Sequence, residues 1–393
     1  MTVAIVFAGV TSFLVALVCT RLIVRVAPRL GFVDKPGLHK THHQPKPLGG
    51  GIGIFLGFAL PLLGGIGYVA VADAWPTAFG TFAGPDDAAY FAGARQQAPL
   101  ALGVVVAAAA MHLLGLFDDR RAMGPYSKLV LQLAIIAALV LTMEYLAATT
   151  PSLRLRVLTY LDAFAGGRAV SVAVTVLWIA GITNAFNFLD NMDGLSAGVA
   201  AICSTAFLLT ALAVGQVFVA LVLALLLGAT LGFLVWNFPP ARIFMGDSGS
   251  LLLGLLLGTL TVRTTYLPPG RSLTGGWYAV LAPLVVLALP LYDLLVVSAI
   301  RISRGKSPFR GDNNHFSHRL VARGMSRRTA VLCIYLVTSA TSIAAMLLPH
   351  VVSTTGALFI FAQTVMVLAV VALLEQHPLP RPGLPAGGGD HAG

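Results

Sequence analysis

Five aspartates in a very apolar chain stand where apolar segments end, and they are the residues best placed to do chemistry. They are Asp118, Asp119, Asp190, Asp193 and Asp247. A carboxylate at the centre of a bilayer costs about 2.5–3.5 kcal/mol on insertion scales, so acids kept at the ends of membrane helices indicate a polar site at the water boundary. If all five lie on one side of the membrane, they can form one site for a cation and phosphate groups.

The first two acids are adjacent, and a lysine follows them. Asp118 and Asp119 end one apolar run, and Lys128 stands at the start of the next. Adjacent carboxylates in a water-poor site raise each other's pKa or bind a cation, and either property is useful for chemistry. A charged helix end beside arginines is the alternative interpretation of this segment alone.

The second polar run is Asn-x-x-Asn-x-x-Asp-x-x-Asp, from Asn184 through Asn187 and Asp190 to Asp193. Side chains three residues apart share one face of a helical end. A polar stripe in a membrane must face protein or a water-filled cavity, because lipid offers no hydrogen-bond partners. A polar turn between two spans is the alternative.

A third polar run extends from residue 237 to residue 250 and contains Asn237 and Phe244. Two prolines end the preceding helix, and the Gly-Asp-Ser-Gly-Ser segment brings backbone N–H groups and the Asp247 carboxylate to the start of the next helix. This combination suits a diphosphate with its metal. Similar letters surround the nucleophile of serine proteases, but no His and Asp partners in a soluble fold accompany them.

The fourth run lies in the long basic loop 301–329 and contains His315, His318 and Arg319. Arginines and histidines near acidic loops can hold phosphates, and Arg319 suits bidentate contacts. A solvated basic loop is the alternative. Zinc is disfavoured, because no cysteine or third histidine lies nearby. Asp293, an acid near the end of an apolar run, is a further candidate to reach the same cavity.

The elements that position these residues are expected to be membrane helices. The chain is 57% hydrophobic and 10% charged, whereas soluble domains carry about 25% charge. We therefore expect an all-α polytopic protein, with a single transmembrane domain over 1–376 and a disordered Pro- and Gly-rich tail over 377–393. Eleven apolar runs are long enough to span a bilayer, namely 2–24, 48–71, 98–117, 128–148, 168–189, 195–214, 217–236, 249–267, 277–300, 330–349 and 353–374.

The charges between these runs predict the orientation. Of the 25 Lys and Arg residues, 19 lie in one alternating set of connecting segments, 21–47, 118–128, 237–248, 301–329 and 375–393. By the positive-inside rule this set is cytoplasmic, so the N-terminus lies outside and the C-terminus inside. The five aspartates then face the cytoplasm. The net charge of +10 thus reflects topology, and no nucleic-acid partner is expected.

The runs together resemble the polyprenyl-phosphate N-acetylhexosamine-1-phosphate transferase family. The resemblance is carried by Asp118-Asp119 with Lys128, by the run from Asn184 to Leu195, by Phe-Met-Gly-Asp-x-Gly-Ser from Phe244, and by His-x-x-His-Arg-Leu from His315. The opening loop, with Asp-Lys-Pro at 34–36, is similar as well. The motifs occur in family order over about residues 30–320.

The resemblance implies a reaction. The family transfers a sugar 1-phosphate from a UDP-N-acetylhexosamine to a membrane-embedded polyprenyl phosphate such as undecaprenyl phosphate, releases UMP, and needs Mg²⁺, with Mn²⁺ as an alternative. It implies a first membrane step of a cell-envelope polysaccharide pathway, at a bacterial cytoplasmic membrane, and leaves a homodimer open. Asn-Ala-Phe-Asn and eleven spans favour the UDP-GlcNAc branch. The alternatives are phospho-MurNAc-pentapeptide transfer and a membrane transporter.

The resemblance also implies roles for the polar residues. Asp247 is expected to bind the metal, with Asp119 as a second ligand, and Asp118 is expected to deprotonate or orient the lipid phosphate. A covalent aspartate intermediate is the alternative mechanism. The residues expected to hold phosphates are Lys128, His315, His318 and Arg319. Those expected on the nucleotide side are Asn187, Asp190, Asp193, Asn237 and Phe244, with Phe244 able to stack on the base. Asn184 is expected to bind substrate.

Two residues depart from the family pattern. Asn191 stands where the family usually has glycine between two acids, and Ser317 stands where the sugar branch often has a middle histidine. Neither change removes a carboxylate. Both bear on the identity of the sugar more than on the reaction.

Overall fold

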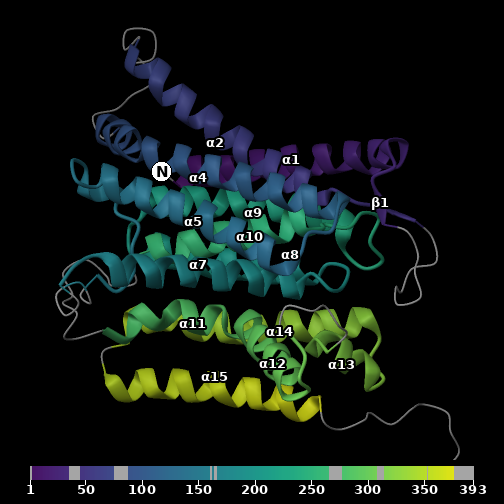
Figure 1. The fold of residues 1–393 in the computed structure, drawn as a ribbon. Coiled ribbons are helices and arrows are strands. Elements are labelled where there is room, and N and C mark those ends of the chain that lie inside the picture. Colours follow the sequence, from purple (N-terminus) through teal and green to yellow (C-terminus); the bar gives the residue numbers. More distant parts are fainter. Residues whose placement is uncertain are drawn as a thin grey trace, which may run out of the picture.

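The computed structural model describes residues 2–34, 45–74, 87–159, 162, 166–264, 277–307, 314–351 and 353–375. Within these residues the fold is a bundle of helices, as expected, accompanied by one two-stranded hairpin. Figure 1 shows the long helices running side by side, with β1 and α13 at the same end of the bundle. The first half of the bundle consists of α1 (Thr2–Val26), α2 (Gly50–Ala74), α4 (Asp87–Arg120), α5 (Pro125–Leu146) and α7 (Ala169–Leu189).

The second half continues with α8 (Leu195–Ala213), α9 (Val217–Asn237), α10 (Asp247–Arg263), α11 (Ala282–Val286), α12 (Ala288–Ser303), α13 (Phe316–Ala322), α14 (Arg327–Leu347) and α15 (Thr354–Leu374). The hairpin pairs β1 (Val33–Asp34) with β2 (Lys46–Pro47) in antiparallel fashion. Short 3-10 turns lie at Ala27–Leu30, Pro151–Leu153, Trp277–Leu281 and Leu348–His350.

The structure makes this a multi-pass membrane protein. Nine helices of the described part are long and apolar enough to cross a bilayer, or ten if Tyr278–Val286 and Ala288–Ser303, which are bent by 67°, form one span. The α10 helix, with 17 residues, is shorter than the 20 or so residues that usually cross the hydrocarbon core. The count of eleven and the orientation of the termini stay predictions.

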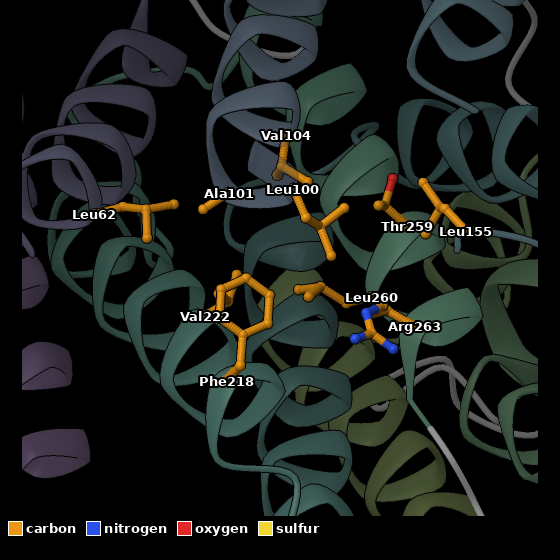
Figure 2. A pocket seen from close by; sticks show the side chains of 10 residues that line it. All are labelled: Leu62, Leu100, Ala101, Val104, Leu155, Phe218, Val222, Thr259, Leu260 and Arg263. Atoms are coloured by element: carbon orange, nitrogen blue, oxygen red, sulfur yellow. The ribbon is translucent and has the colours of Figure 1, made fainter. Parts of the chain in front are cut away.

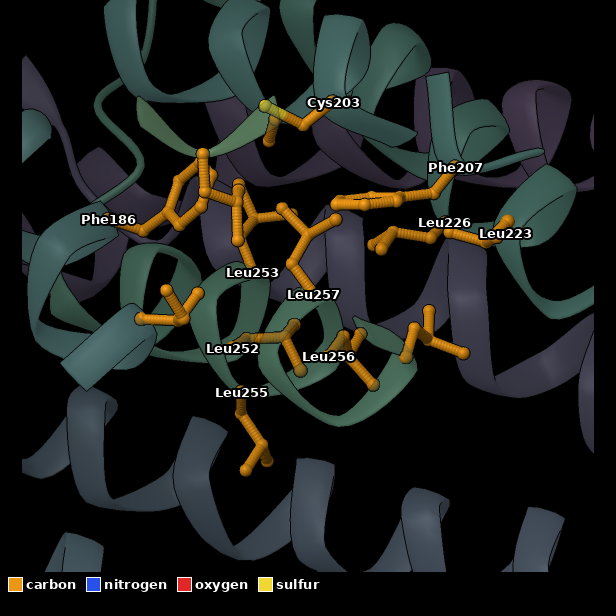
Figure 3. Close-up of a cluster of buried hydrophobic side chains, with 14 of the residues drawn as sticks. Phe186, Cys203, Phe207, Leu223, Leu226, Leu252, Leu253, Leu255, Leu256 and Leu257 are labelled. Atoms are coloured by element: carbon orange, nitrogen blue, oxygen red, sulfur yellow. The ribbon is translucent and has the colours of Figure 1, made fainter. Parts of the chain in front are cut away.

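The α10 helix is the centre of the bundle. Every residue from Ser248 to Thr261 is buried, and its leucines meet side chains of α7, α8 and α9 in the cluster of Figure 3. A helix that is apolar on all sides belongs in a core. Glycines allow the close approach, because a Cβ at Gly254 would lie 2.5 Å from the Thr183 Cα on α7. The start of α10 is thereby fixed at one end of the core.

The segment before α10 is fixed to the first loop. Phe244 N–H donates to Pro47 O over 2.9 Å, Gly50 N–H to Phe244 O over 3.0 Å, and Gly51 N–H to Met245 O over 3.2 Å. These backbone bonds place β2 and the start of α2 beside residues 244–246. Parts of three predicted segments, 35–44 of the first loop, 308–313 of the basic loop and the tail from 376, lie outside the described residues.

Candidate active site

The C-terminal end of α4 contacts the N-terminal end of α10 through Asp119. Its Oδ1 accepts from Asp247 N–H over 2.8 Å, and its Oδ2 accepts from Ser248 N–H over 3.1 Å. A helix leaves its first N–H groups unpaired, and a carboxylate there also favours the positive end of the helix dipole. Asp119 therefore joins two distant segments by capping α10.

Asp118, Asp119 and Asp247 form an acidic cluster around Lys128. Lys128 lies between Asp118 and Asp247. Its Nζ is 3.0 Å from Asp118 Oδ2 and forms an ion pair with Asp247 Oδ2 as well. Met123 N–H donates to the second Asp118 oxygen over 2.5 Å. The side chains of Asp118 and Lys128 are 11% and 14% exposed, so water screens this group of charges poorly.

The polar stripe of α7 faces the same cluster. Asn187 Nδ2 donates to Asp247 Oδ1 over 2.7 Å and to Ser250 Oγ over 2.9 Å. One turn earlier, Asn184 Nδ2 donates to Gln132 Oε1 of α5 over 2.9 Å. The stripe therefore faces protein, as predicted, and it links α7 to both α10 and α5.

The turn after α7 carries the next pair of acids. Asp193 accepts from Ala241 N–H over 2.9 Å, and its carboxylate lies 3.5 Å from Lys46 Nζ. The Lys46 ammonium also lies 5.0 Å from the centroid of the Phe244 ring. Burial, together with the neighbouring carboxylates of the cluster, raises the pKa of Asp190 well above its usual value. Crowded carboxylates of this kind favour a bound cation.

Asn237 is a structural link between the second and third polar runs. Its Oδ1 accepts from Gly194 N–H over 2.9 Å, and its Nδ2 donates to Ile243 O over 2.8 Å. The residue is 3% exposed. It holds the turn after α7 against the segment that precedes α10, and its predicted contact with the nucleotide stays a prediction.

His315 is held by an acid from α12. Its Nδ1–H donates to Asp293 Oδ2 over 2.8 Å, and the other oxygen of Asp293 accepts from Phe316 N–H over 3.0 Å. Asp293 is fully buried. A carboxylate on Nδ1 fixes the tautomer and the direction of the other ring nitrogen. Asp293 thus does reach this region, although its partner is a histidine rather than the acidic cluster.

The other two residues of the basic loop have different surroundings. The rings of His318 and His315 lie 6.4 Å apart between centroids. Burial, together with the nearby His315 and Arg327, lowers the pKa of His318 below its usual value. Arg319 Nη2 lies 2.8 Å from Glu375 Oε2 at the end of α15. Burial raises the pKa of Glu375.

The structure therefore brings most of the predicted site together at one end of the bundle. Asp118, Asp119, Lys128, Asn187 and Asp247 are connected directly by hydrogen bonds or ion pairs. Two of the residues predicted for the nucleotide side, Asp193 and Phe244, form a second group around Lys46, whereas Asn184 contacts Gln132. Arg319 is paired with α15, and its predicted phosphate contact stays a prediction.

The acidic cluster offers a place for a divalent cation. No group of three His, Cys, Asp or Glu side chains is arranged to hold a metal ion among the residues that the structure describes. Asp118 Oδ2 and Asp247 Oδ2 nevertheless converge on one cation, the Lys128 ammonium. This fits Mg²⁺, which usually takes one or two carboxylates and completes its shell with water and substrate phosphates. Because both oxygens of Asp119 accept backbone N–H groups, Asp118 is an alternative partner to Asp247.

The apolar pocket of Figure 2 is separate from this cluster. It lies between α2, α4, α9 and α10, and its one charged lining residue is Arg263. Arg263 ends α10, whereas Asp247 begins it. The pocket therefore lies toward the opposite end of α10 from the predicted chemistry.

Two contributors to the site were less evident in the sequence. Lys46 is not among the predicted site residues, and the structure places it against Asp193 and Phe244. Gln132 is fully buried on α5, and its Oε1 accepts a hydrogen bond from the Asn184 amide. The available signal for Gln132 was a polar residue one turn after Lys128 inside an apolar run.

Comparisons with known proteins identify a family model and several relatives of this chain. The model of glycosyl transferase family 4 matches residues 101–265. A probable undecaprenyl-phosphate N-acetylglucosaminyl 1-phosphate transferase of Bacillus subtilis (strain 168) is 31% identical, over 88% of this chain and 85% of its own. A decaprenyl-phosphate N-acetylglucosaminephosphotransferase of Mycobacterium tuberculosis is 32% identical, over 84% and 78%. An undecaprenyl-phosphate alpha-N-acetylglucosaminyl 1-phosphate transferase of Escherichia coli (strain K12) is 26% identical, over 79% and 75%.

Proposed function

Because the chain belongs to glycosyl transferase family 4, we propose that it transfers N-acetylglucosamine 1-phosphate from UDP-N-acetylglucosamine to a polyprenyl phosphate. An oxygen of the lipid phosphate attacks the β-phosphorus of the nucleotide sugar. The bond from that phosphorus to the bridging oxygen breaks, and UMP leaves. The relatives named above act on undecaprenyl or decaprenyl phosphate, which favours this branch over phospho-MurNAc-pentapeptide transfer.

The observation that carries the proposal is the position of Lys128 between Asp118 and Asp247 at the end of a membrane bundle. Phosphoryl transfer depends on positioning and on neutralising charge rather than on covalent chemistry by the protein. The cluster provides one ammonium and several carboxylates at the ends of α4, α5 and α10, where a lipid phosphate and a water-soluble nucleotide can meet.

The residues divide by their position in the site. Lys128 would bind phosphate oxygens, and Asp118 beside it would accept a proton from the lipid phosphate or orient that phosphate for attack. The Asp193 and Phe244 group would hold uridine, with Lys46 next to it. His315, directed by Asp293, and His318 would approach the phosphates from the basic loop. These roles are supported by contacts within the protein and by the resemblance of the motifs.

A divalent cation completes this picture. Asp247 would hold Mg²⁺ or Mn²⁺ together with Asp119 or Asp118, and the cation when bound would neutralise the phosphate oxygens during transfer. Asn187 fixes the direction of the Asp247 carboxylate through its 2.7 Å hydrogen bond. Lys128 would then be free to pair with the phosphate that enters.

The site is proposed to face the cytoplasm of a bacterium. The aspartates lie at the end of the bundle that also carries α13 of the basic loop (Figure 1), and positive segments stay inside. UDP-sugars are made in the cytoplasm, so this side supplies the donor. A homodimer is left open by these observations.

The function is tested by incubating the purified protein with undecaprenyl phosphate, Mg²⁺ and a panel of UDP-sugars while UMP is measured. We expect UMP release with UDP-N-acetylglucosamine, and none when the lipid phosphate or the divalent cation is left out. Release with UDP-MurNAc-pentapeptide alone would assign the protein to the other branch. Uptake of a solute by proteoliposomes without any UMP would support a transporter instead.

A further inference from the structure

One side-chain hydrogen bond connects the turn that carries Asp190 and Asp193 with the helix that carries His318. Ser317 Oγ donates to Asn191 Oδ1 over 2.5 Å, between residues 126 positions apart. Ser317 is fully buried. Because a buried polar group without a partner is costly, this bond constrains how α13 sits on the end of α7.

Asn191 is fixed on its other side as well. Its Nδ2 donates to Phe188 O over 2.8 Å. The Phe188 ring meets the His315 ring edge-on, with centroids 5.7 Å apart, and Arg301 lies 5.0 Å from the centroid of the same phenyl ring. Asn191 therefore contacts Ser317 directly. It also contacts Phe188, whose ring packs against His315, two residues before Ser317 in the chain.

Asn191 and Ser317 are also the two positions at which the sequence departs from the pattern that it resembles. A glycine at position 191 would offer no side-chain acceptor to a hydroxyl. In this chain the two departures are the two ends of one hydrogen bond. Residues that share one bond are expected to be coupled, because changing either removes the same interaction.

We propose that Asn191 and Ser317 are a coupled pair of positioning residues, whose hydrogen bond sets the distance between the nucleotide side of the site and the loop histidines. Neither residue takes part in the chemistry. The pair holds His315 and His318 against the turn at 190–193. The histidines and the residues of the turn can then contact the same bound nucleotide sugar. The inference rests on the proposed function, because its role is to align two parts of that site.

A double-variant cycle on the full-length protein tests the pair. Ser317→Ala removes a single oxygen, and Asn191→Ala removes the acceptor. We expect each single variant to lower kcat for UMP release from UDP-N-acetylglucosamine about tenfold, with KM for the nucleotide sugar changed less than about threefold. The double variant should be no slower than about the worse single variant, because both changes remove one bond. Ser303→Ala, an exposed serine bonded within its own helix, should have no effect.

The unfolding temperature of each variant checks that the fold is retained, and Asn191→Gly replaces Asn191→Ala if the latter unfolds. A double variant near a hundredfold slower, as two independent losses would give, would overturn the coupling. A rise in KM with kcat unchanged would overturn the positioning role. Wild-type protein that releases no UMP from any UDP-sugar is a separate outcome, and it would overturn the proposed function itself.

Discussion

At the scale of single residues, the central feature is a lysine shared by two carboxylates. Lys128 contacts Asp118 and Asp247, and Asn187 directs the remaining oxygen of Asp247. A cation and an anion that are already paired within a protein are oriented before substrate arrives, which reduces the reorganisation needed during reaction. When substrate binds, a phosphate can pair with the Lys128 ammonium, and a divalent cation can pair with the carboxylates.

Neutralising either carboxylate should stop the reaction without unfolding the protein. We expect Asp118→Asn and Asp247→Asn each to lower UMP release by at least about a thousandfold, because each removes a charge that transfer requires. The same change at Asp162, which pairs with Arg156 away from the cluster, serves as the matched control. Near-wild-type UMP release from Asp118→Asn or Asp247→Asn would contradict the role proposed for that aspartate.

The loop histidines provide a second test at this scale. We expect His318→Ala to slow UMP release by about a hundredfold, because it removes a hydrogen-bonding side chain that we propose contacts the phosphates. His350→Ala, at an exposed histidine in the turn that follows α14, is the control. A loss below threefold for His318→Ala would support the alternative interpretation, in which this segment is only a solvated basic loop.

At the scale of elements, the site depends on how α10 begins. Gly246 has φ 72° and ψ 178°, a conformation found essentially in glycine alone. Its backbone turns the chain so that Asp247 starts the helix and the first N–H groups meet Asp119. One glycine thus determines both the capping of α10 and the direction of the Asp247 carboxylate.

Gly246→Ala should therefore harm stability and activity together. The new Cβ would lie 2.5 Å from Asp119 Oδ2, and the backbone conformation would cost about 1–3 kcal/mol. We expect a lower unfolding temperature of the solubilised protein and a loss of UMP release. Gly181→Ala, at a helical glycine of α7 with open space around it, should leave both unchanged. Equal behaviour of the two variants would contradict this account of the start of α10.

The position of the acids at helix ends could be predicted from the sequence, whereas several helix bounds and side-chain contacts could not. Acids at the ends of apolar runs indicated a shared site because charge avoids the membrane interior. The sequence did not show that Asp119 caps α10 or that Asn237 bridges two backbone segments. Those contacts depend on which helix ends pack together, and this is decided by small residues in the core. Asp293 was expected in this region, but the sequence did not show that its partner is His315.

At the scale of the whole molecule, charged side chains lie at the two ends of the bundle. The acidic cluster and the basic loop share one end of the helices, while Arg156 pairs with Glu144 over 2.7 Å where α5 ends, far along that helix from Lys128. The helical membrane fold could be predicted from the composition and from the length of the apolar runs. The number of spans did not, because α10 is short and α11 and α12 are bent against each other.

The predicted orientation can be measured by cysteine labelling. Cys19 and Cys333 are first replaced by alanine, while the buried Cys203 is kept. A cysteine at exposed Thr149 should then react with an impermeant maleimide on intact spheroplasts, and one at exposed Arg304 should react only after permeabilisation. The reverse pattern would place the aspartates outside and contradict a cytoplasmic site.

The most direct test of the central claim follows the phosphorus atom. The purified protein is given UDP-N-acetylglucosamine labelled with ³²P at the β-phosphate, undecaprenyl phosphate and Mg²⁺, and the label is counted in the lipid and nucleotide fractions. We predict that the label moves into the lipid, with unlabelled UMP formed in equal amount and no transfer by Asp247→Asn. Label that stays in the nucleotide as UDP while sugar reaches the lipid would contradict phosphosugar transfer by this site.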